Sequence, residues 1–315
     1  MKYLNELRKI VDGQILENEP MSKHTTYGIG GPAKVFIKPK DRDDLAKILK
    51  FSKENSINAH FFGSGSNLLI SDEGIDGIVL SPAKCLKQLK IEGNLIFAES
   101  GVMLGKIVKE ATKRKLTGLE SLIGVPGTLG GALSMNAGAY GNEISNFLKY
   151  VHVMNMDGKI IKYSQSQIDF SYRYSNFKSD EFILDAHFNL KTDSFSEIIK
   201  KKEYSSKSRK LNQPLKFRSA GSVFKNDEKY SAGFLIDKAG LKGTRFGDAE
   251  ISTKHANFFI NHGNAKSSDM LKLISVARKE VYKKYKIFLG FTEFLSSDQL
   301  NDAKIVYKNK KNKKL

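Results

Sequence analysis

The stretch Gly124-Val-Pro-Gly-Thr-Leu-Gly-Gly-Ala132 decides the fold of this chain, and Asn136-Ala-Gly-Ala-Tyr-Gly141 follows it almost at once. Six glycines therefore fall within eighteen residues. Such a stretch has few side chains with which to build a core, so its backbone must closely approach another strand or a ligand. We interpret it as a loop that can cradle a phosphate group.

A second loop, Gly63-Ser-Gly-Ser-Asn67, follows a predicted strand at residues 59–62. Its glycines let the backbone approach an anion, and its hydroxyl groups add hydrogen-bond donors. Alone it is weak evidence, because an ordinary tight turn explains it equally well and the third glycine of a dinucleotide fingerprint is missing. Together, two separated cradles predict a long ligand with a central diphosphate, and a dinucleotide such as FAD fits this description.

The remaining pattern is typical of a mixed α and β protein with more than one domain, since 315 residues exceed the usual size of one core. Apolar residues at helical spacing predict helices through residue 55, at 103–115 and at 268–284, the first capped by Asp41 or Asp43. Strands are predicted at 94–99, 151–155 and 159–163. Met156-Asp157-Gly158 joins the last two as a hairpin.

Composition excludes several classes of protein. The chain begins with charged residues and has no apolar run of the ~18 to 20 residues that cross a bilayer, so we expect a cytoplasmic protein without membrane insertion. Cys85 is the only cysteine and is expected to pack rather than to react. The six histidines show neither HExxH nor a compact ligand cluster, and no metal site is predicted.

The formal charge of +18 is unevenly distributed. Residues 199–210 hold six positive charges against one acid, and residues 304–315 hold six lysines and no acid. The first run is either an entrance for an anionic substrate or a solvated helix face, and the second is expected to be a frayed tail. Nucleic-acid binding is disfavoured, because tryptophan is absent and few aromatic residues interrupt the lysine runs.

Two polar residues have sequence neighbours that suggest a functional role. Arg173 lies in Phe170-Ser-Tyr-Arg-Tyr-Ser175, where it needs either an anionic ligand or a structural salt bridge. Ser222 lies in Ala220-Gly-Ser-Val-Phe-Lys-Asn226 without a GxSxG elbow, so it does not resemble a hydrolase nucleophile. A positioned hydroxyl group can instead donate a proton.

Taken in order, these segments resemble the UDP-N-acetylenolpyruvoylglucosamine reductase (MurB) family over residues 19–294. The motifs are SKHTTY, IGGPA, GSGSNLL, GVPGTLGGA, NAGAYG, YRYS, QPL, AGSVFKN and KHANFFIN. The resemblance implies an α+β protein: a two-subdomain FAD-binding region of the vanillyl-alcohol oxidase type, followed by a substrate-binding domain. We place the FAD-binding subdomains at residues 1–80 and 81–198, the substrate-binding domain at 199–300 and a basic tail at 301–315.

The resemblance also implies an activity, namely the FAD-dependent, NADPH-driven reduction of UDP-N-acetylglucosamine enolpyruvate to UDP-N-acetylmuramate in peptidoglycan precursor synthesis. FAD is expected to bind tightly without a covalent bond, and the protein to be a monomer. Arg173, Ser222 and Glu293 match the catalytic groups. The matching substrate contacts are Tyr172, Lys225, Asn226 and Glu250, and the matching FAD contacts are Tyr27, Gly63, Ser64, Gly65, Ser66, Asn67, Leu68, Gly124, Pro126, Gly127, Thr128, Gly130, Gly131, Ala132, Asn136, Ala137 and Gly138.

The sequence departs from the family pattern in places. The segment around Glu293 has one residue apparently inserted and lacks the following arginine. Gly28 stands where many relatives carry a basic residue, and Glu250 where a glutamine often contacts substrate. The short segment at 142–149 predicts the form of the family without an extra tyrosine-bearing loop. An oxidase of the same fold and a basic nucleic-acid-binding protein are the alternatives.

Overall fold

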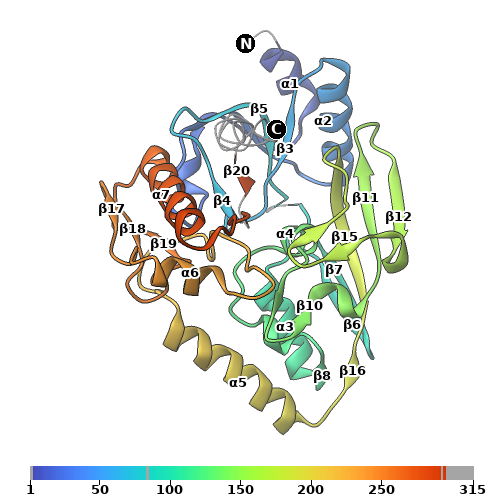
Figure 1. Ribbon diagram of the computed structural model, residues 1–315. Helices are drawn as coiled ribbons and strands as arrows, with labels where there is room; N and C mark the ends of the chain where they lie inside the picture. Colours follow the sequence, from blue (N-terminus) through green and yellow to red (C-terminus); the bar gives the residue numbers. More distant parts are fainter. Residues whose placement is uncertain (1–2, 83–84, 292–293, 296–315) are drawn as a thin grey trace, which may run out of the picture. The chain divides into compact units, whose positions relative to one another are not determined.

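The computed structural model describes residues 3–82, 85–291 and 294–295. For residues 294–295 it describes the backbone alone. The chain forms two compact units, neither of which is one continuous stretch (Figure 1). Unit 1 contains the described residues of Met1–Glu19, Lys34–Ser64 and Asp76–Asn212, and unit 2 those of Pro20–Ala33, Gly65–Ile75 and Gln213–Leu315. The three-domain division drawn from the sequence stays a prediction.

A four-stranded sheet begins unit 1, in the order β1 (Gln14–Pro20), β2 (Pro32–Lys38), β5 (Ile75–Leu80) and β3 (Ala59–Phe61). Helices α1 (Leu4–Ile10) and α2 (Arg42–Glu54) share a hydrophobic core with it. The Asp41 side chain accepts a hydrogen bond of 2.9 Å from the backbone N–H of Asp44 and so caps α2, as predicted.

A five-stranded sheet carries the rest of unit 1, in the order β12 (Ile160–Ser164), β11 (Leu148–Asn155), β15 (Glu181–Asn189), β7 (Leu95–Glu99) and β6 (Leu89–Glu92). Helices α3 (Leu104–Lys113) and α4 (Leu129–Ser134) lie against it, and their apolar residues share its largest core (Figure 1). The predicted hairpin joins β11 to β12, with Gly158 at a φ of 76°.

Short elements surround the predicted site in unit 1. They are β8 (Leu116–Thr117), η2 (Glu120–Leu122), β9 (Gly138–Ala139), β10 (Asn142–Glu143), η3 (Ile144–Phe147), η4 (Gln165–Gln167), β13 (Phe170–Ser171), β14 (Tyr174–Ser175) and β16 (Lys191–Thr192). The basic run identified from the sequence lies in the long helix α5 (Phe195–Asn212).

Unit 2 has a core of its own. A three-stranded sheet, β17 (Arg245–Phe246), β18 (Ala249–Ile251) and β19 (Phe259–Asn261), packs with α6 (Ala232–Lys238) and α7 (Ser267–Tyr285). The turn η1 (Met21–Lys23) and the parallel pair β4 (Leu68–Leu69) and β20 (Phe294–Leu295) complete it. None of the helices that the structure describes combines the length and apolar character that a bilayer span needs.

Candidate functional site

The two glycine-rich loops predicted from the sequence meet in unit 1. A Cβ atom at Gly63 would lie 2.7 Å from Oγ1 of Thr128, and a Cβ at Gly130 would lie 3.1 Å from Cβ of Ser100. A Cβ at Gly63 would collide with the Thr128 side chain, and one at Gly130 would be in unusually tight contact with Ser100, so glycine allows both close approaches. Thr128 also caps α4 by accepting a hydrogen bond from the N–H of Gly131.

Hydrogen bonds join the second half of this glycine-rich region to the β13–β14 hairpin. The Asn136 side-chain amide donates to the carbonyl of Ser171 at 3.1 Å, and Nη2 of Arg173 donates to the carbonyl of Gly138 at 2.8 Å. The Ser175 hydroxyl group donates to the carbonyl of Ser134 at 2.7 Å, on the last residue of α4. The predicted cofactor loop and the predicted catalytic arginine are therefore parts of one hydrogen-bonded structure.

Three residues of this structure adopt left-handed backbone conformations that disfavour ordinary side chains. Asn136, Tyr140 and Arg173 have φ values of 40°, 50° and 55°. Backbone strain of this kind costs about 1 to 3 kcal/mol per residue and tends to occur where function requires it. Arg173 is the second residue of the two-residue turn that joins β13 to β14. The left-handed conformation of its backbone allows this tight turn.

Two guanidinium groups come near each other here. Within the described part of the chain Arg173 has no acidic partner, and its side chain lies 5.0 Å from the centre of the Tyr172 ring. Arg209, on α5, lies 5.8 Å from the centre of the Tyr140 ring. Burial lowers the pKa of Arg209, Tyr140 opposes this effect, and the positive charge of Arg173 adds to it. Two neighbouring cations that form no ion pair with a described acid favour an anionic ligand, although Glu143 lies beside Arg173 at Gly138.

Buried polar atoms that lack a hydrogen-bond partner test whether the site suits the expected cofactor. Among the described residues these atoms are Ser100 Oγ, Ser121 Oγ, Asn136 Oδ1 and Arg209 Nε. They border the glycine-rich loop: Ser100 contacts it at Gly130, and Cδ of Arg209 would lie 3.2 Å from a Cβ at Gly124. Native proteins satisfy nearly all such atoms, so a ligand rich in oxygen and nitrogen fits this region, as FAD would.

Ser121 and Arg209 are residues that the sequence interpretation missed. Ser121 lines a pocket of ≈ 310 Å³ together with Tyr140, Lys200 and Tyr204. The only signal for Arg209 was its place in the basic run, where it is one cation among six. Neither interpretation of the basic run at 199–210, an entrance for an anionic substrate or a solvated helix face, describes all of its residues. Arg209 is half-buried, whereas Lys207 is exposed.

The predicted residues of unit 2 are held by two buried asparagines of the KHANFFIN motif. The side-chain amide of Asn261 donates to the carbonyl of Tyr27 at 2.8 Å, and Tyr27 itself is buried in the core. Asn257 accepts from the N–H of Phe224 at 2.9 Å and donates to its carbonyl at 2.8 Å. The backbone carbonyl of Asn257 also receives the N–H of Val223. These contacts fix the segment that carries Ser222.

The residue after Tyr27, Gly28, lies against the side chain of Arg218. Gly28 has a φ of 67°, and a Cβ there would lie 2.1 Å from Nη1 of Arg218. The guanidinium group of Arg218 therefore occupies the space that a side chain at position 28 would take. Both residues line an open pocket of ≈ 690 Å³, along with Lys23 and Lys216.

The expected substrate contacts of unit 2 have protein partners. The N–H of Lys225 donates to the carbonyl of Gly290 at 2.7 Å, and Oδ1 of Asn226 accepts from the N–H of Ala232 at the start of α6. Glu250 lies on β18, and its carboxylate is 2.8 Å from Nε2 of His262. This pair accounts for Glu250 without a ligand.

The other predicted residues lie as follows. Glu293 and the basic tail at 301–315 fall outside the described residues. Tyr172 is exposed, and Ala132 and Ala137 are buried. Of the remaining predicted FAD contacts, unit 1 contains Ser64, Gly124, Pro126, Gly127, Thr128, Gly130, Gly131 and Gly138, and unit 2 contains Gly65, Ser66, Asn67 and Leu68.

Comparison with known proteins decides the family. The family model for the UDP-N-acetylenolpyruvoylglucosamine reductase C-terminal domain matches residues 213–291, and that for a FAD binding domain matches residues 33–164. The UDP-N-acetylenolpyruvoylglucosamine reductase of Carboxydothermus hydrogenoformans is 40% identical over 289 residues, which cover 91% of this chain and 96% of that protein. The chain belongs to the UDP-N-acetylenolpyruvoylglucosamine reductase family.

Further members of the family agree. The enzyme of the same name from Caldanaerobacter subterraneus is 42% identical over 288 residues, covering 91% of this chain and 95% of that protein. The crystal structure of the Thermus caldophilus reductase (MurB) superimposes with a TM-score of 0.76 at 32% identity, covering 90% of this chain and 98% of that one. The expected family and the mixed α and β fold with a FAD binding domain are confirmed.

Proposed function

We propose that Arg173 and Ser222 are the side chains of this chain that act on the substrate. The overall reaction follows from family membership: the protein is a FAD-dependent oxidoreductase that uses NADPH to reduce UDP-N-acetylglucosamine enolpyruvate to UDP-N-acetylmuramate, a step of peptidoglycan precursor synthesis. FAD, when bound, supplies the hydride that reaches the enolpyruvyl methylene carbon. The protein must then stabilise negative charge and deliver a proton.

The role proposed for Arg173 depends on one observation: in the described chain its side chain forms no ion pair with an acid. Its backbone is also strained, and the cation Arg209 lies nearby. Hydride addition to an enol ether beside a carboxylate builds negative charge toward that carboxylate. A fixed guanidinium group stabilises this charge more in the transition state than in the ground state. We assign Arg209 to binding an anionic part of the cofactor or substrate.

Ser222 is proposed to protonate the carbon next to the one that receives hydride. Its segment is held on one side by Asn257, and a Cβ at the preceding Gly221 would meet no atom within 4 Å, so there is open space beside the serine. A hydroxyl group fixed by its backbone and next to open space suits a proton donor. Glu293 is proposed as the third catalytic group on the family resemblance alone.

The predicted FAD contacts around Gly63 and Gly124 remain our proposal for the cofactor site, supported by the close approach at Gly63 and by the unpartnered polar atoms nearby. Tyr172, Lys225 and Asn226 remain proposed substrate contacts. Glu250 also remains a proposed substrate contact, although its carboxylate is paired with His262.

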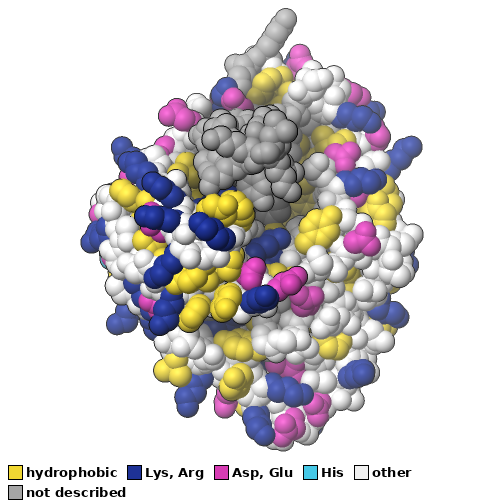
Figure 2. Space-filling view, in the orientation of Figure 1, with side chains coloured by type: hydrophobic (Ala, Val, Ile, Leu, Met, Phe, Trp, Pro, Cys, Tyr) yellow, Lys and Arg dark blue, Asp and Glu magenta, His cyan; other side chains and the backbone are white. Residues whose placement is uncertain are grey.

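We further propose a monomer in the cytoplasm that binds no nucleic acid. A UDP-sugar and NADPH as reactants support the location. Against nucleic-acid binding, Figure 2 shows lysine and arginine side chains spread among acidic and hydrophobic ones over the face drawn, without a continuous basic stripe among its described residues. Gel filtration of the flavin-loaded protein tests the oligomeric state.

Half-reaction kinetics test the roles. The visible spectrum of the purified protein should bleach on anaerobic addition of NADPH and recover when the UDP-enolpyruvyl sugar is added. Ser222→Ala should leave bleaching intact and slow recovery by about 100-fold or more, as for removal of a general acid. Equal loss of both half-reactions would refute the proton-donor role. A protein that cannot be reconstituted with FAD would refute the flavin assignment.

A further inference from the structure

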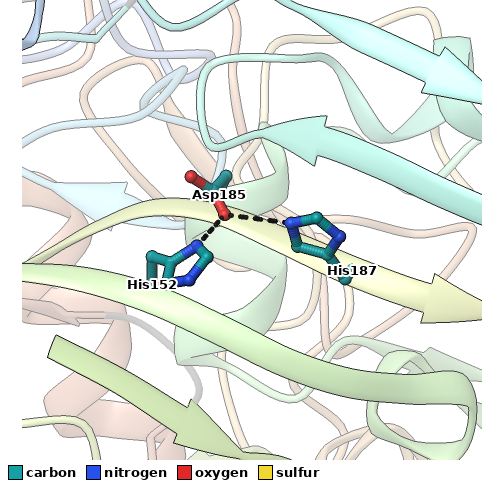
Figure 3. A group of neighbouring side chains, drawn as sticks. All are labelled: His152, Asp185 and His187. Atoms are coloured by element: carbon teal, nitrogen blue, oxygen red, sulfur yellow. Dashed lines mark hydrogen bonds and ion pairs between the residues drawn. The ribbon is translucent and has the colours of Figure 1, made fainter.

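Three potential metal ligands that are not among the residues proposed for catalysis meet in unit 1. His152 lies on β11, and Asp185 and His187 lie on β15 (Figure 3). Nδ1 of His152 is 2.7 Å from Oδ1 of Asp185, and Nε2 of His187 is 3.7 Å from the same oxygen. One ligand atom from each residue lies within 4.8 Å of the others. Both imidazole rings therefore point at one carboxylate oxygen.

The sheet itself produces this convergence. His152 is directly opposite Asp185 in the antiparallel pairing of β11 with β15, and Tyr150 is opposite His187. The register shifts between Leu148 and Tyr150 and again between His152 and Val153. Such irregularities redirect side chains and are frequent next to functional sites. Here they flank the histidine on β11.

Burial and charge distinguish the carboxylate of Asp185 from an ordinary surface acid. Its side chain is 1% exposed, and Oδ2 receives Nη2 of Arg42 at 2.8 Å. The same nitrogen binds Glu99 at 2.8 Å, and Glu99 is opposite Asp185 on β7. Asp185 and Glu99 thus share the one guanidinium group of Arg42 beside the imidazole rings. Arg42 orients one oxygen of Asp185 and leaves the other facing His152 and His187.

We propose that His152, Asp185 and His187 form a binding site for one Zn²⁺ ion, with Nδ1, Oδ1 and Nε2 as ligands and water in the fourth position. Two imidazoles and a carboxylate are ligands that Zn²⁺ prefers, and three protein ligands plus water is a common tetrahedral set. Arg42 then serves as the outer partner that holds the carboxylate ligand. The ion would link adjacent strands and takes no part in the reduction.

The distances require only side-chain rotation. Bonds of ~2.0 to 2.1 Å in a tetrahedron separate ligand atoms by about 3.4 Å. The His152–Asp185 contact therefore lengthens as its hydrogen bond is replaced, while the two rings, each at one side of Oδ1, close around the ion. Each histidine side chain is 27% exposed, so the ion and its water can enter from solvent.

The surroundings both favour and oppose a cation. Tyr150 stacks on His187 with ring centres 4.1 Å apart and fixes its orientation. Lys162, whose Nζ is 3.8 Å from the centre of the Tyr150 ring, and Lys149 both repel a cation at His187, but both side chains are exposed to solvent.

Zinc retention tests the proposal. The FAD-loaded protein is stripped with a chelator, equilibrated with Zn²⁺ alone, desalted, and analysed for metal by mass spectrometry, while calorimetry gives the affinity. Wild type should retain one Zn²⁺ per chain, and Zn²⁺ should raise its melting temperature. His152→Ala and His187→Ala should each weaken binding about tenfold or more and remove the thermal shift. Asp185 is left intact because its replacement would also remove its ion pair with Arg42.

His262→Ala is the matched control, because His262 also forms a close histidine–carboxylate pair, with Glu250 at 2.8 Å. This variant should bind Zn²⁺ as wild type does. The proposal fails if wild type retains no Zn²⁺, if the His187→Ala variant binds it equally well, or if His262→Ala abolishes binding. None of these outcomes depends on reductase activity, so the proposed catalytic roles stand or fall separately.

Discussion

Replacement of Asn257 by alanine is expected to destabilise unit 2 strongly. The Asn257 side chain pairs with both the N–H and the carbonyl of Phe224, and the two residues are 2% and 1% exposed. Alanine would leave two backbone groups of Phe224 buried without partners. Each unsatisfied group costs about 1 to 3 kcal/mol, so the free energy of unfolding should fall by about 2 to 6 kcal/mol.

Urea unfolding followed by circular dichroism measures this change, since the chain lacks tryptophan and intrinsic fluorescence is weak. Asn264→Ala is the control, because that side chain is exposed and makes one long contact of 3.3 Å with Asp248. The control should change stability by less than about 0.5 kcal/mol. If Asn257→Ala also falls within that range, the Phe224 backbone groups are not held as described.

Other substitutions test the site and the chemistry of single groups. Gly63→Ala should weaken FAD binding about tenfold in a flavin-fluorescence titration, because the new Cβ would lie 2.7 Å from Oγ1 of Thr128; unchanged affinity would contradict the close approach. Arg209→Gln should raise the KM for substrate or the Kd for FAD about tenfold, whereas Lys207→Gln, at an exposed position of the same helix, should change neither; equal effects would point to net charge alone. Burial raises the pKa of Cys85 to about 11 from 9.0, so its reaction with a disulfide reagent should be slow at pH 7 and accelerate up to pH 11. Because the pKa of Cys85 is higher in the folded than in the unfolded protein, this residue stabilises the fold below pH 9 and loses that contribution as pH rises to 11. Fast labelling at pH 7 would contradict the burial of the thiol.

Local patterns were sufficient for much of the fold. The Asp41 cap, the apolar stripe of α3 and the turn at Gly158 depend on residues close together in the chain, so sequence predicted them within a few positions. The glycine-rich loops were predicted for the same reason, because few sequences place so many glycines together without a close approach. The ordered motifs then identified the family.

Only the tertiary structure could show contacts between residues that lie far apart in the sequence. Asn257 and Asn261 read as ordinary polar residues in a strand, and only the fold shows that they hold Phe224 and Tyr27. Arg209 was hidden among exposed cations, and burial against the Gly124 loop singles it out. The contact between His152 and Asp185 could not be predicted, because the two residues are 33 apart in sequence and become neighbours only through the β11–β15 register.

The glycine-rich stretch shows the same division. Its sequence determined that the backbone must approach something, since glycine has no side chain to prevent it. Which atoms it approaches was decided by folding, which brought Thr128 to Gly63 and Ser100 to Gly130. Sequence spacing limits local backbone geometry, but the contact between two loops depends on the sheets and helices that support them.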